Sequence, residues 1–173
     1  MALLTALLVG IPTATALAHG FGTSANPDHY VADSSYHTWA ETESSDGEYY
    51  AMIGSWLAAI NGQLRDRTDM SVGQQTYNTN TDVYWYVTPS VGTADATCVD
   101  FSSSLVCNQV RVRFNTTWAY TYSSAQRQQG ACHEIGHSVG FDDSQPENNT
   151  GCMSGGGQGV LSSHEIGHIN AQY

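Results

Sequence analysis

One short pattern constrains this chain more than any other, the pattern H-E-x-x-H-x-x-G-x-x-D at His133, Glu134, His137, Gly140 and Asp143. Residues four apart lie on one face of a helix, so both histidines can direct their imidazoles at a single metal ion. Glu134 can reach a water molecule beside that ion without being a ligand. Gly140 can end the helix in a left-handed conformation, and the turn can bring Asp143 back to the metal. Three protein ligands and one open position are typical of a catalytic zinc site.

A second H-E-x-x-H pattern occupies residues 164–168, but no Gly-x-x-ligand sequence follows it. Ser162 and Glu165 form a capping box, which predicts that Glu165 caps a short C-terminal helix instead of serving catalysis. One alternative stays open, because Glu165 could replace Asp143 as a distant third ligand of the zinc ion. A plain amphipathic helix with surface histidines would explain neither Gly140 nor Asp143.

The composition restricts the class of partner. The 173 residues favour a single domain, and five basic residues face 16 acidic ones for a net charge of -11. Such a charge argues against nucleic acid or an anionic membrane as a partner. We expect a monomer that acts on protein or peptide substrates.

The N-terminal region predicts export. Residues 3–11 form an apolar run that is too short to span a bilayer as a helix, and Ala16-Leu17-Ala18 matches an A-x-A cleavage site. We therefore expect a signal peptide at 1–18 and a single domain at 19–173, secreted to the extracellular space. Residues 19–46 are polar and irregular, and they form either a short pro-segment or an N-terminal segment of the domain.

Four cysteines suit an oxidising compartment, and sequence alone permits three pairings. We favour Cys98 with Cys107, which would close a short loop between strands. The remaining pair, Cys132 with Cys152, would tie the helix of the metal pattern to the segment before Met153. A zinc ion bound by cysteines is disfavoured, because the chain has no C-x-x-C pair.

Hydrophobic periodicity predicts the main elements. Apolar residues recur at helical spacing within 47–65, which predicts a helix there. Val83 to Thr88 form a β-branched and aromatic run that stops at Pro89, which predicts a strand. In residues 109–115 apolar and polar residues alternate, which predicts a half-buried strand. The last of these is a candidate edge strand beside the cleft. A capping box at Ser123 and Gln126 starts the helix of the metal pattern. The same reading predicts a short strand at 35–38 and loops at 66–82 and 90–108.

The stretch from His133 to Asp143, followed by Met153 in Cys-Met-Ser-Gly, resembles the metzincin zinc peptidases. The aspartate in place of the usual third histidine is similar to the snapalysin family of small secreted bacterial neutral proteases. The spacing of the helix, strands and Cys-Met turn is also similar to matrixin-type domains. The resemblance implies an α+β fold with a twisted, mixed, mainly parallel sheet, an active-site helix and a small C-terminal subdomain ending in a helix. It also implies that Met153 packs under the zinc ion as a Met-turn residue, and that substrate lies along an edge strand.

These observations predict a secreted zinc-dependent endopeptidase with one catalytic Zn²⁺ ion. Zinc would polarise the scissile carbonyl, and Glu134 would take a proton from water and deliver it to the leaving amine. The main alternative is a secreted, non-catalytic binding domain of the same fold. Glu134 argues against that alternative, because metal binding alone needs no base at that position. The pattern says nothing about calcium.

Overall fold

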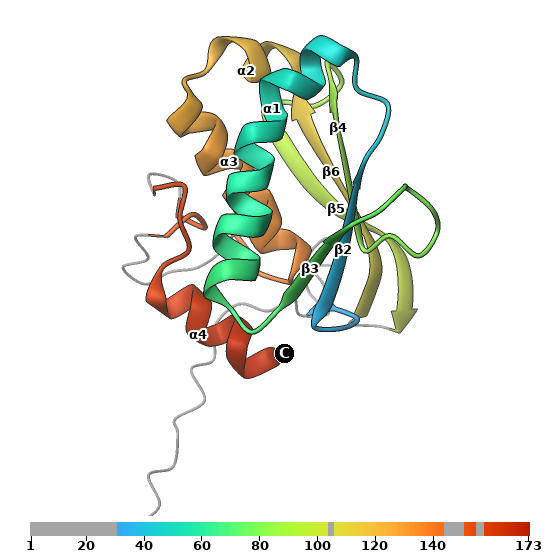
Figure 1. The fold of residues 1–173 in the computed structure, drawn as a ribbon, viewed down its shortest axis with the longest axis vertical. Helices are drawn as coiled ribbons and strands as arrows, with labels where there is room; N and C mark the ends of the chain where they lie inside the picture. Colours follow the sequence, from blue (N-terminus) through green and yellow to red (C-terminus); the bar gives the residue numbers. More distant parts are fainter. Residues whose placement is uncertain (1–30, 104–105, 144–150, 155–157) are drawn as a thin grey trace, which may run out of the picture.

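The computed structural model describes residues 31–103, 106–143, 151–154 and 158–173, so the predicted signal peptide at 1–18 lies outside the described residues. None of the helices in these ranges is long and apolar enough to cross a membrane. Figure 1 shows the arrangement of the elements. In chain order they are β1 (Val31–Ala32), β2 (Tyr36–Glu41), α1 (Asp46–Ala59), the π-helical η1 (Ile60–Arg65), β3 (Ser71–Gln74), β4 (Val83–Thr88), β5 (Ala94–Ser103), β6 (Val106–Asn115), α2 (Thr116–Thr121), α3 (Ser124–Ser138) and α4 (Ser163–Gln172).

The strands form one mixed sheet in which β1, β6, β4, β2 and β3 follow one another, and β5 pairs with β6. All pairs are parallel except that between β5 and β6, which is antiparallel. The fold is therefore α+β with a mainly parallel sheet, as predicted. Because β2 lies between β4 and β3, residues 36–41 of the N-terminal segment 19–46 belong to the sheet.

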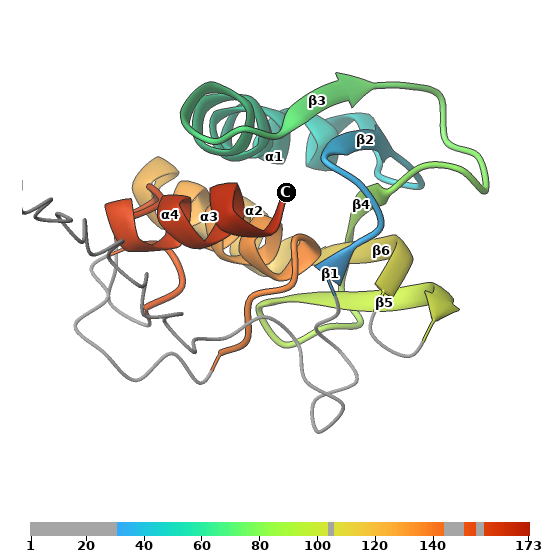
Figure 2. The same ribbon diagram turned by 90° about the horizontal axis from the view of Figure 1, so that it is seen from below.

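Helices α1 and α3 lie side by side on one face of the sheet, as both views show (Figures 1 and 2). Their apolar faces meet the inward side chains of the strands, and β4 alternates between buried and half-buried residues along its length. Aromatic rings fill the space between α1 and the sheet. Trp56 of α1 stacks on Trp85 of β4 with ring centroids 5.4 Å apart, and it meets Trp39 of β2 edge-on. Each of these three rings is at most 2% exposed.

The helix predicted at 47–65 is present as α1 followed by η1, but its apolar face is narrower than expected. Tyr50 is 75% exposed and Leu57 is 37% exposed, whereas Met52, Trp56 and Ile60 are fully buried. The two exposed residues fit the helical period only loosely. They lie on the flank of the helix, away from the sheet.

Two predicted loops contain strands. The segment 66–82 holds β3, and the segment 90–108 holds the whole ten-residue strand β5 and the start of β6. β3 has a single apolar residue, Val72, and its extended form is set by parallel pairing with β2 from Tyr36 to Trp39. β5 is fixed in the same way by its antiparallel ladder with β6. In both cases hydrogen bonding to a neighbouring strand stabilises an extended conformation that the local composition does not predict.

The expected edge strand is also corrected. Residues 109–115 belong to β6, which is flanked by β4 and β5 and so lies inside the sheet. Among the described strands β5 pairs with β6 alone, and it is therefore the edge strand on this side. The alternation of apolar and polar residues in 109–115 indicates a strand with one packed face. Interior strands of a sheet show this alternation as readily as edge strands do.

Both favoured cysteine pairs are bonded in the structure. Cys98–Cys107 joins β5 to β6, and Cys132–Cys152 joins α3 to the segment that carries Met153. The described residues contain no free cysteine. The second bond connects parts of the chain on either side of the turn that carries Asp143.

Candidate metal centre and cleft

Helix α3 begins and ends as its sequence dictates. Ser123 accepts a hydrogen bond from the Gln126 backbone N–H, while the Gln126 side chain accepts one from the Ser123 backbone, which completes the capping box. The helix ends at Ser138, and Gly140 follows with a φ of 106°, a conformation that side chains rarely adopt. The reversal directs the next residues back along the helix, toward His137.

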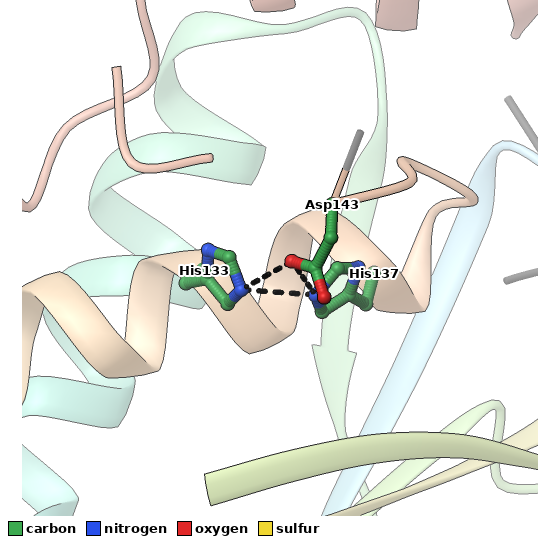
Figure 3. Close-up of side chains that lie close together, drawn as sticks. All are labelled: His133, His137 and Asp143. Carbon is green, nitrogen blue, oxygen red and sulfur yellow. Dashed lines mark hydrogen bonds and ion pairs between the residues drawn. The ribbon is translucent and has the colours of Figure 1, made fainter. Parts of the chain in front are cut away.

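The turn brings three potential ligands to one point (Figure 3). His133 Nε2 lies 3.0 Å from His137 Nε2, and Asp143 Oδ1 lies 3.0 Å from the first nitrogen and 3.2 Å from the second. These three residues are the only group of at least three His, Cys, Asp or Glu residues in the described ranges whose donor atoms could hold one metal ion. His137 is 4% exposed and Asp143 is 67% exposed, so the cluster opens to solvent on the aspartate side.

The opposite nitrogen of each imidazole is held by a backbone carbonyl. His133 Nδ1 lies 3.1 Å from the Cys152 carbonyl oxygen, and His137 Nδ1 lies 2.8 Å from that of Phe141. A carbonyl only accepts, so each Nδ1 carries a proton and each neutral Nε2 is left with a lone pair. Two such lone pairs and a carboxylate oxygen converging within about 3 Å repel one another unless a cation lies between them. The donor set therefore fits a divalent ion such as zinc, with the outer hydrogen bonds that metal-bound histidines require.

The two histidines differ in their electrostatics. Burial and the neighbouring His137 lower the pKa of His133. Burial also lowers the pKa of His137, but its hydrogen bond to Asp143 and the charge of Glu134 outweigh this effect, and the net shift is upward. In the absence of a metal ion, His137 therefore binds a proton more readily than His133 does.

Glu134 lies on the floor of the site. It is 5% exposed, and its Oε2 has no hydrogen-bond partner among the described residues. Burial raises the pKa of this carboxyl to about 8, and the nearby carboxylates of Asp95 and Asp143 add to the rise. An acid whose pKa lies near neutrality can both accept and release a proton.

Met153 supports the helix from below. It is 3% exposed, and its sulfur lies against Gly136 so closely that a Cβ at that glycine would come within 2.1 Å of it. Gly136 lies between the two histidines, so this contact sets the depth at which that turn of α3 packs. The role of Met153 as a Met-turn residue under a zinc ion stays a prediction of the metzincin resemblance.

The distant-ligand alternative finds Glu165 engaged elsewhere. Its Oε1 accepts the backbone N–H of Met153 at 3.0 Å, and its Oε2 accepts that of Ser162 at 2.5 Å. It is 1% exposed and belongs to the capping box of α4. The structure thus brings Asp143 to the histidines and gives Glu165 a structural contact with the Met153 segment.

A cleft of about 320 Å³ opens over the cluster. One wall is formed by His133, Glu134, His137 and Asp143, and the other by residues 94–97 of β5. Asp95 in that wall is paired with Arg113 of β6, whose Nε donates to its Oδ1 at 2.9 Å. The β5 wall is the part of the site that sequence reasoning missed. The signal was a weak alternation of small residues, Ala94, Ala96 and Cys98, between polar ones.

Three solved structures resemble this chain at low sequence identity. Myroilysin shares 12% identity at a TM-score of 0.40, over 61% of this chain and 48% of that one. High choriolytic enzyme 1, a hatching-enzyme zinc-protease from the medaka fish Oryzias latipes, shares 14% sequence identity at a TM-score of 0.48, over 85% of this chain and 94% of that one. Metalloproteinase-II from Bacteroides fragilis shares 10% sequence identity at a TM-score of 0.43, over 84% of this chain and 53% of that one. The chain thus spans about half the length of the first and third.

No protein-family profile matches the sequence, and no curated protein does. At TM-scores below 0.5 the structural likenesses decide nothing about activity. The case for a function rests on the cluster and the cleft themselves.

Proposed function

We propose that this chain is a secreted zinc-dependent endopeptidase that hydrolyses peptide bonds in proteins. The observation that carries the proposal is the convergence of His133 Nε2, His137 Nε2 and Asp143 Oδ1 beside a cleft, with both Nδ1 atoms anchored by carbonyl oxygens. That arrangement holds three electron-pair donors together and leaves room for a further ligand on the open side. It supports Asp143 as the third ligand over Glu165.

His133, His137 and Asp143 would hold a zinc ion, whose Lewis acidity would polarise the scissile carbonyl and make a water molecule more acidic. The proton transfers belong to Glu134. Its buried carboxylate accepts a proton from the water whose oxygen bonds to the scissile carbonyl carbon. The resulting carboxylic acid then donates that proton to the amine as the C–N bond breaks, so Glu134 serves first as base and then as acid. The Glu134 Oε2 suits this role, because no donor among the described residues occupies its lone pairs.

The edge strand β5 provides a binding surface for an extended peptide. Residues 94–97 line the cleft opposite the histidines, and β5 has no second strand partner among the described residues. A peptide that pairs with this edge would be held by main-chain hydrogen bonds, which are indifferent to sequence. Such binding suits a protease that accepts many protein substrates.

The two disulfides support secretion of the protein. Disulfides persist in oxidising compartments and are rare in the cytosol. The predicted signal peptide at 1–18 agrees with this assignment.

The test uses the purified full chain, casein, and a peptide blocked at both ends with a fluorophore and quencher about an internal bond. We expect cleavage of both substrates, loss of activity with a zinc chelator, and recovery on addition of Zn²⁺. A protein that binds zinc at one equivalent through His133 and His137, yet cleaves neither substrate, would be the non-catalytic binding domain instead.

A further inference from the structure

The second H-E-x-x-H pattern repeats the histidine geometry of the first. On α4, His164 Nε2 lies 3.2 Å from His168 Nε2, with ring centroids 4.5 Å apart and ring planes at 86°. On α3, the corresponding values for His133 and His137 are 3.0 Å, 4.5 Å and 87°. Both α4 histidines are half-buried at the surface. The pair is therefore arranged like ligands and remains within reach of solvent.

We propose that His164 and His168 form a second metal site, which binds one divalent ion of the copper, nickel or zinc class. Two imidazole nitrogens bound at about 2.0–2.1 Å and separated by 3.2 Å subtend an angle of about 100° at the ion. This angle lies between the square-planar and tetrahedral values that these metals adopt with histidine ligands.

The site is not a second hydrolytic centre. Glu165, the residue that would act as its base, points inward and accepts the backbone N–H groups of Met153 and Ser162. No third His, Cys, Asp or Glu among the described residues converges with the pair. With its two imidazole ligands, the site prefers Cu²⁺, in the order Cu²⁺ above Ni²⁺ and Zn²⁺.

Occupancy of this site stabilises α4. The two nitrogens meet only while residues four apart lie on one helical face, so the ion binds the folded helix and not the unfolded segment. The stabilised helix carries Glu165, which holds Met153 beneath α3. A metal on α4 thereby reinforces the support of the catalytic helix without contacting substrate.

The test is a metal titration of the full chain after it has been stripped with a chelator. Four proteins are compared: the parent, H133A/H137A, H164A/H168A, and the variant with all four changes. Cu²⁺ and Ni²⁺ are added singly, and binding is followed by calorimetry. Any ion held by other histidines or by the N-terminus is common to all four and cancels. We expect each double variant to bind one equivalent fewer than the parent, and the quadruple variant two fewer.

A second readout does not depend on stoichiometry. In the H133A/H137A background, Cu²⁺ should show a paramagnetic resonance signal coupled to two nitrogens, and Ni²⁺ should raise the unfolding midpoint. His168→Gln alone, which keeps the side chain polar, should abolish both effects, and Gln172→Ala on the same helix should leave them unchanged. The proposal is overturned if H164A/H168A binds as many equivalents as the parent, or if H133A/H137A binds no ion on α4.

Discussion

Helices α3 and α4 carry the same five-residue pattern, H-E-x-x-H, and orient their histidines in nearly the same way. They differ in the glutamate. Glu134 of α3 lies in the wall of the cleft, and its buried Oε2 has no hydrogen-bond partner in the described part of the chain. Glu165 of α4 instead accepts backbone N–H groups with both oxygens. Glu134 thus presents its carboxylate to the cleft, whereas the carboxylate of Glu165 caps the N-terminus of α4 and holds Met153.

The residues around each pattern decide this difference. After α3, Gly140 reverses the chain and Asp143 returns to the histidines. Before α4, Ser162 lies three residues ahead of Glu165, and this spacing draws the carboxylate into a capping box. The pattern fixes the placement of two histidines, while the neighbouring residues determine whether the glutamate faces the cleft and whether an aspartate returns to the histidines.

The largest effect is expected for Glu134→Gln. The amide keeps the shape of the side chain but cannot accept the proton of water, so kcat/KM should fall by about 10³-fold while zinc stays bound. Peptide cleavage and zinc content measured on the same preparation give the answer. Hydrolysis at the parental rate would remove Glu134 from the mechanism.

Asp143→Ala tests the third ligand. Removal of this carboxylate should weaken zinc binding by at least about 100-fold, which exceeds what loss of a residue behind a ligand costs. The neighbouring Asp142→Ala is the matched control and should keep a full equivalent of zinc after dialysis. If Asp143→Ala keeps its zinc and Glu165→Ala loses it, the distant glutamate is the ligand and the metzincin assignment fails.

The sequence predicted the parts of the site that are local in the chain. The histidines, Glu134, Gly140 and Asp143 lie on one helix and its turn, where the 3.6-residue period and a glycine are enough to place them. The strand predicted at Val83–Thr88 is likewise local in the chain, because its β-branched and aromatic residues are followed directly by Pro89. The prediction matches the bounds of β4.

The parts that were missed depend on partners far along the chain. β5 consists largely of Ala, Asp, Thr and Cys, and its register with β6 shifts between Cys98 and Ser103, so no clean alternation marks it. The contact of Glu165 with Met153 likewise joins two segments that only the tertiary fold brings together. Local propensity carries no record of such pairings.

The glutamate of α4 should matter for stability. Glu165→Ala removes the carboxylate that accepts the buried N–H of Met153 and the half-buried N–H of Ser162, so the free energy of unfolding should fall by about 3 kcal/mol. Capping alone would cost about 1 kcal/mol. Gln126→Ala removes the corresponding capping-box partner from α3, where it is exposed, and is the matched control. Urea unfolding of zinc-saturated protein measures both, and equal losses would show that the Met153 contact contributes little.

The two helices also differ in what lies behind them, and this gives the smallest predicted effect. Behind α3, His37 of β2 is 1% exposed and its Nε2 lies 3.1 Å from Ser138 Oγ. The Ser138 hydroxyl donates to the Ile135 carbonyl, so the imidazole Nε2–H donates to Ser138. His37 Nδ1 is buried without a partner among the described residues, and protonation there would place an N–H where no acceptor is found.

Burial accordingly lowers the pKa of His37 to about 4, from 6.5 in the unfolded chain. Between these values the unfolded state binds the proton more tightly, so stability is fully present above the unfolded pKa and is lost as the pH falls toward 4. From about pH 7.5 to about pH 5 the loss due to this group should be about 2 kcal/mol. Urea unfolding of the chelated parent and of His37→Gln at both pH values isolates it, because the metal ligands titrate alike in the two proteins. The parent should lose more stability than the variant. Equal losses would mean that the imidazole behind α3 is solvated or paired, and that α3 owes no pH sensitivity to it.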